Sequence, residues 1–105
     1  MNTDVLGSAW DETEVDGWQG RWRRIGNTNE FDAQFTHPSG KIIGGRLRMT
    51  VEGNTVHIHR WNPNGAPGSC AYVGTFSGRT VSGSYYCIDQ NGRPTPNYQW
   101  NAVIS

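Results

Sequence analysis

The chain has 105 residues, a formal net charge of zero and a mean hydropathy of −0.68. A chain of this length forms one domain with a modest core. Its neutral balance of charge gives no general attraction to nucleic acid or to a membrane surface. No apolar run approaches the length of a transmembrane helix. We therefore expect neither a membrane span nor a general polyanion binder.

The first sixteen residues, MNTDVLGSAWDETEVD, carry five of the nine acidic residues and few apolar ones. We expect an acidic N-terminal arm over 1–16, which docks through Trp10 or frays, and one domain over 17–105. Met1 precedes polar residues and not the apolar region of a signal peptide. We therefore expect either a chain that starts in the cytosol or one from which a leader was removed.

The rest of the chain is rich in Trp, Tyr and Gly, a composition typical of β-structure. Alternation of apolar and polar residues predicts strands, separated by turns and loops rich in Gly, Pro and Asn, at 17–25, 30–37, 41–51, 55–61, 70–77, 80–87 and 98–105. The turn lengths predict registers that place Trp22 beside Ala33 and Ala33 beside Gly45. The prediction is an all-β, antiparallel up-and-down β-barrel of seven strands, or of eight if the arm pairs. A β-sandwich is the alternative.

The segment from Cys70 to Cys87 reads as one β-hairpin. A two-residue turn at Gly78-Arg79 places Tyr72 opposite Tyr85 and Cys70 opposite Cys87. The cysteine pair falls on a non-hydrogen-bonded site, where cross-strand side chains lie closest. We therefore predict a Cys70–Cys87 disulfide and a secreted or periplasmic protein. Two reduced cysteines in a cytoplasmic protein are the alternative.

Two arginines, Arg24 and Arg60, point into the predicted barrel by alternation, and no acidic residue of the predicted strands does so. A buried arginine needs a carboxylate, carbonyls or an anionic ligand. We predict a barrel mouth that holds a small aromatic or acidic ligand. The predicted ligand-binding residues are Trp22, Arg24, Arg60, Tyr72, Tyr85 and Trp100. In the alternative interpretation, both arginines reach water and aromatic rings fill the barrel.

The outward face predicts a ladder of alternating charge, with Asp32 between Arg23 and Arg46, and this pattern stabilises a sheet rather than binding nucleic acid. We expect Trp61 to stack on Arg46. His57 and His59 share a face but lack further ligands, so we predict no metal and no cofactor.

No catalytic set converges on a face, and we predict a non-catalytic binding protein of undetermined oligomeric state. Two alternatives remain. One is a carbohydrate-binding module that uses loop aromatics, with Trp61 and Tyr98 as sugar contacts. The other is a small cyclase or isomerase in which Tyr72 or Tyr85 acts as an acid.

Gly20-x-Trp22, followed by Gly26, resembles the opening strand and turn of the calycin group, the avidin-like and lipocalin-like barrels. Gly83-Ser84-Tyr85 resembles a later step in the same barrels. The resemblance implies the barrel architecture. It does not imply biotin, because Arg24 and Ile25 stand where avidin-like proteins approach the loop that holds the ureido group. The helix that ends lipocalin-like chains has no counterpart here.

Overall fold

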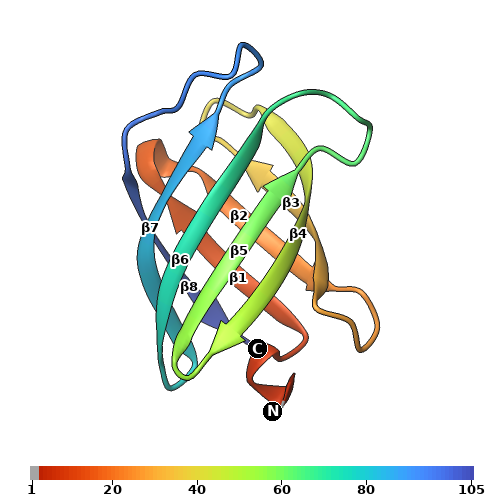
Figure 1. The fold of residues 1–105 in the computed structure, drawn as a ribbon, viewed down its shortest axis with the longest axis vertical. Coiled ribbons are helices and arrows are strands. Elements are labelled where there is room, and N and C mark those ends of the chain that lie inside the picture. The colour runs from red at the N-terminus through yellow and green to blue at the C-terminus, as the bar shows by residue number, and fades with distance from the viewer. Residues whose placement is uncertain (1–2) are drawn as a thin grey trace.

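A computed structural model describes residues 3–105 (Figure 1). Eight strands are separated by tight turns and loops, with one 3-10 helix, η1 (Thr3–Leu6), before them and another, η2 (Val15–Gly17), between the first two. The strands are β1 (Ala9–Glu14), β2 (Gln19–Arg24), β3 (Glu30–Thr36), β4 (Ile42–Glu52), β5 (Thr55–Trp61), β6 (Ser69–Ser77), β7 (Thr80–Ile88) and β8 (Tyr98–Ile104). In the described part of the chain, no helix is long and apolar enough to span a membrane.

Each strand pairs antiparallel with the next, and β1 pairs with β8 to close the barrel. The predicted all-β up-and-down barrel is confirmed, in its eight-stranded form, and the sandwich alternative is wrong. The eighth strand comes from the acidic segment expected to dock or fray. There β1 pairs with β2 on one side and with β8 on the other.

The predicted registers are present because short turns leave the strands no freedom to slip. Trp22 lies beside Ala33, and Ala33 beside Gly45. In the hairpin of β6 and β7, Tyr72 lies opposite Tyr85, and Cys70 is joined to Cys87 by the predicted disulfide.

Three tryptophans fill the middle of the barrel. Trp10 stacks on Trp22 with ring centroids 5.5 Å apart, Trp22 lies 5.7 Å from Trp100, and all three are buried. The Trp10 indole nitrogen donates to the Leu6 carbonyl at 2.8 Å, which ties η1 across the end of the barrel near the C-terminus. We call this the lower end. The opposite end, where η2 lies, is the upper end.

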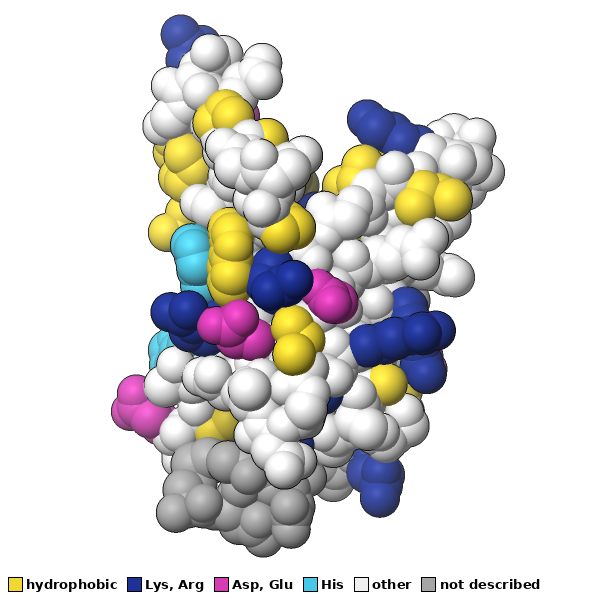
Figure 2. All heavy atoms as spheres, turned by 90° about the vertical axis from the view of Figure 1, so that its right-hand side faces the viewer, with side chains coloured by type: hydrophobic (Ala, Val, Ile, Leu, Met, Phe, Trp, Pro, Cys, Tyr) yellow, Lys and Arg dark blue, Asp and Glu magenta, His cyan; other side chains and the backbone are white. Residues whose placement is uncertain are grey.

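The outer surface carries the predicted charge ladder, with Arg46 bonded to Asp32 at 2.7 Å and Arg48 to Glu30 at 2.9 Å. Figure 2 shows side chains of both signs next to one another on this face. The predicted partner of Trp61 is wrong: the guanidinium over its ring, at 5.6 Å, belongs to Arg48.

Gly74 and Gly83 face each other across β6 and β7. A Cβ on Gly74 would come 2.7 Å from the Trp100 ring, and one on Gly83 would overlap the Val73 carbonyl oxygen. Both positions therefore let the sheet bend closely around Trp100.

We expect Gly83→Ala to lower the free energy of unfolding by about 1–3 kcal/mol or more, because the new methyl group meets backbone that cannot move aside. The matched control is Gly44→Ala on exposed β4 backbone, where the nearest atom would be 3.9 Å away; its effect should stay within about 1 kcal/mol. Urea denaturation measures both. Equal effects of the two substitutions would contradict this account of Gly83.

The disulfide closes a loop with a sequence separation of 17. Reduction should lower the free energy of unfolding by about 3 kcal/mol, because the unfolded chain regains the entropy of that loop. Urea denaturation with and without a thiol reductant measures the difference. The double variant Cys70→Ser, Cys87→Ser should not respond to reductant, and an unchanged wild-type midpoint under reduction would count against the prediction.

Candidate functional site

A pocket of about 480 Å³ opens at the upper end of the barrel. Strand ends and η2 surround it, and the disulfide forms part of its wall. The lining residues are Glu14, Val15, Asp16, Trp18, Phe35, Ile43, Arg60, Cys70, Tyr85, Cys87 and Tyr98.

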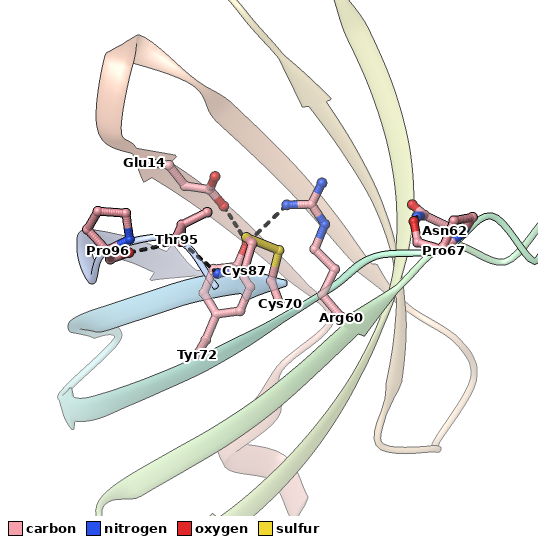
Figure 3. Close-up of a disulfide and its surroundings, with 9 residues drawn as sticks. All are labelled: Glu14, Arg60, Asn62, Pro67, Cys70, Tyr72, Cys87, Thr95 and Pro96. Atoms are coloured by element: carbon pink, nitrogen blue, oxygen red, sulfur yellow. Dashed lines mark hydrogen bonds between the residues drawn. A yellow bond between two sulfur atoms is a disulfide. The ribbon is translucent and has the colours of Figure 1, made fainter. Parts of the chain in front are cut away.

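The polar centre of this pocket is a chain of hydrogen bonds among side chains from three strands. Glu14 on β1, Arg60 on β5 and Tyr72 on β6 point toward one another (Figure 3). The Tyr72 hydroxyl donates to Glu14 Oε2 at 2.6 Å and accepts from Arg60 Nη1 at 3.2 Å. An acceptor and a donor therefore stand on either side of one buried hydroxyl.

Arg60 is fixed by packing as well as by this bond. Its guanidinium carbon lies 3.8 Å from the centroid of the Phe35 ring, a cation–π contact. Gly45 leaves the room for this arrangement, because a Cβ there would come 3.3 Å from Arg60 Nε and 3.4 Å from the Phe35 ring. Among the side chains that the structure describes, no carboxylate forms an ion pair with Arg60. Arg60 also lines the pocket.

Glu12, two residues before Glu14, lies deeper on the same inner face of β1. Its side chain is 1% exposed, and its carboxyl oxygens and the nearby Trp22 indole nitrogen have no hydrogen-bond partner among the described residues. Gly20 makes space for this carboxyl group, since a Cβ there would overlap Glu12 Oε1.

Burial raises the pKa of Glu12 far above its ordinary value of 4.5. The negative charge of Glu14 raises this pKa further, and Arg60 opposes the shift. Two carboxyl groups this close cannot both ionise in a buried site. Glu12 therefore keeps its proton at neutral pH.

Tyr72 and Tyr85 stack with their ring centroids 4.8 Å apart. Burial, followed by the negative charge of Glu14, raises the pKa of both hydroxyl groups above the ordinary value of 10. Both remain protonated donors over the physiological range. The site thus holds its protons firmly and presents a fixed pattern of donors and acceptors.

The structure brings Arg60, Tyr72 and Tyr85 together, as the sequence predicts. Trp22 and Trp100 lie beneath them in the core, 5.7 and 5.5 Å from the Tyr72 ring. Neither of them lines the pocket.

Arg24 lies at the lower end, away from the other predicted ligand-binding residues. There it donates to the backbone carbonyls of Thr28, Gly7 and Asn27. Its side chain closes the lower turn and does not reach the pocket.

The two predicted sugar contacts do not share a surface. Trp61 lies on the outside of β5, where His59 stacks on it at 5.6 Å. Tyr98 lines the upper pocket, 5.6 Å from Tyr85. Among the described residues, no group of His, Cys, Asp and Glu side chains is arranged to hold a metal.

The acidic residues of the predicted strands point outward, as expected, and the inward carboxyl groups come from the arm, which that prediction left out of the barrel. Once β1 pairs, alternation places Trp10, Glu12 and Glu14 inside and Asp11 and Thr13 outside. The available signal was this two-residue spacing from Trp10. The pattern did not predict a strand because two of its inward residues, Glu12 and Glu14, are acidic, whereas the rest of the inner face is largely apolar.

Comparison with known proteins places the fold. No family model matches the chain, and no curated protein matches it. The chain is similar to EF1p2_mFAP2b bound to DFHBI, with 20% identity, a TM-score of 0.67 and coverage of 97% of this chain and 95% of that one.

A redesigned β-barrel, mFAP1, bound to DFHBI, is 20% identical with a TM-score of 0.66, over 98% of this chain and 97% of that one. The bradavidin2–biotin complex is 15% identical with a TM-score of 0.55, over 93% and 97%. The resemblance to avidin-like calycin barrels is thereby confirmed at the level of the fold.

The buried proton on Glu12 predicts a dependence of stability on pH. Above the ordinary pKa of about 4.5 the unfolded chain releases this proton while the folded protein keeps it, so rising pH favours unfolding, by at most about 1.4 kcal/mol per pH unit. Glu12→Gln removes this effect. The variant should match the wild type near pH 4 and become the more stable of the two as pH rises toward 8.

Urea denaturation between pH 4 and 8 measures the difference, with the exposed Glu52→Gln as the control for loss of a carboxyl group. Parallel stability curves for wild type and Glu12→Gln would mean that the proton is not held as described.

Proposed function

We propose that this protein is a non-catalytic binding barrel whose upper pocket holds a small aromatic compound, or a small acid, through an acceptor group directed at Arg60. The observation that carries the proposal is Arg60 itself. Its guanidinium is fixed against Phe35, faces the pocket and has a neutral hydroxyl as its hydrogen-bond partner. A carboxylate, phenolate or carbonyl of a ligand would complete its hydrogen bonding.

The size and walls of the pocket support a small flat ligand. Its volume of about 480 Å³ lies within the roughly 300–1,000 Å³ of small-molecule sites. Aromatic side chains form much of the wall, namely Trp18, Phe35, Tyr85 and Tyr98. The similar barrels are bound to small molecules, DFHBI or biotin, which supports the same general use of the fold here.

The proposal extends to location. A disulfide between Cys70 and Cys87 persists in an oxidising compartment, which supports a secreted or periplasmic protein. For a sugar-binding role the support is weaker, because the Trp61 ring is already covered by His59 and Arg48. The charge ladder on the outer face gives no support to nucleic-acid binding.

The test measures by calorimetry the binding of 2-naphthoate and coumarin, two flat aromatic compounds with acceptor oxygens. We expect Arg60→Met to weaken binding by roughly 10- to 100-fold, because a charge-assisted hydrogen bond is lost while packing on Phe35 is kept. The matched control is Arg24→Met at the lower end, which should bind like the wild type. Equal affinities in wild type and Arg60→Met, or no binding of either compound, would contradict the proposal.

A further inference from the structure

We infer that the upper pocket selects flat aromatic lactams, in which an N–H donor stands directly beside a carbonyl acceptor. This inference rests on the small-molecule binding proposed above and adds the chemical class of the ligand. It follows from two complementary groups that the pocket holds side by side.

The donor and the acceptor are set at a fixed spacing by Tyr72. Its hydroxyl binds Glu14 Oε2 at 2.6 Å and Arg60 Nη1 at 3.2 Å, so both groups stand beside the same oxygen atom. Glu14 and Arg60 also line the pocket. A ligand edge that donates one hydrogen bond and accepts another therefore fits this pair, with its N–H toward Glu14 and its carbonyl toward Arg60.

Both groups keep hydrogen-bonding capacity after their protein contacts are made. A carboxylate offers about four acceptor positions and a guanidinium offers five N–H donors. Tyr72 uses one position on each. Each group therefore keeps positions for a hydrogen bond to a ligand.

The charges at the centre of the site favour a neutral dipolar ligand over an ion. Glu12 is neutral, so Glu14 stands beside Arg60 there, and Asp16, the other acidic residue that lines the pocket, is exposed. An anionic ligand would be attracted by Arg60 and repelled by Glu14. A cationic ligand would be attracted by Glu14 and repelled by Arg60. The neighbouring tyrosines are neutral donors, so they add no charge that would attract or repel an ionic ligand. A lactam satisfies both groups without adding net charge.

The arrangement is preorganised, which is what converts a pattern of polar groups into specificity. Phe35 and the space at Gly45 hold Arg60 in place, and Tyr72, 2% exposed and stacked on Tyr85, holds Glu14. A ligand that lacks the N–H group would leave the half-buried Glu14 carboxylate facing an atom that cannot donate. Such mismatches cost more than the missing bond alone.

The experiment compares 2-quinolone with coumarin, which has nearly the same shape but a ring oxygen in place of the N–H. We expect calorimetry to show 2-quinolone binding at least about 10-fold more tightly to the wild type. In Glu14→Met this ratio should fall to about one, and 2-naphthoate should bind more tightly because repulsion is removed. The control Glu52→Met, at an exposed acidic residue of β4, should keep the wild-type ratio.

Equal binding of 2-quinolone and coumarin to the wild type would overturn the lactam inference and leave the proposed function standing. Binding of neither, together with no binding of 2-naphthoate, would overturn both. If Glu14→Met does not fold, as judged by circular dichroism, N-methyl-2-quinolone replaces the variant. With its donor blocked it should bind the wild type no better than coumarin, and tighter binding would overturn the inference.

Discussion

The structure depends on the pairing of β1 with both β2 and β8. Without it, seven strands would form an open sheet with two exposed edges, and open edges invite pairing with other chains. With it, every strand has two neighbours, and Trp10 completes the stack of tryptophans in the core. The same pairing carries Glu12 and Glu14 inside. Closure of the barrel and the polar character of its interior therefore have one origin.

The barrel is filled unevenly along its axis, and this decides where a ligand can enter. Tryptophans occupy the middle, and η1 and Arg24 close the lower end through backbone carbonyls. Toward the upper end the residues on the inner face change from large rings to Arg60, Glu14 and the two tyrosines. Polar groups need partners, so they hold one another at fixed positions and do not collapse into a dry core.

The acid pair gives the site its chemistry. Burial makes two charges intolerable, and the proton that stays on Glu12 leaves Glu14 opposite Arg60 as a balanced pair. Tyr72 connects the two halves of that pair through a single hydroxyl. A neutral pair of opposite groups suits a polar ligand without net charge. Without β1, the strands after residue 16 would present Arg60 with no carboxyl group beside it. Such a site would suit an anion.

The sequence by itself determined the strands, their registers and the disulfide, because side-chain alternation and turn length are local properties that tolerate no slip once one face is buried. It also placed Arg60, Tyr72 and Tyr85 on a common face. Only the tertiary structure decided that Arg24 lies at the opposite end, because strand direction and closure set which ends meet. It likewise decided that Ala9–Glu14 is a strand. The positions of Glu12 and Glu14 inside the barrel follow only once the partners on both sides of β1 are known, and the burial of Glu12 and the proton it keeps exist only in the closed barrel.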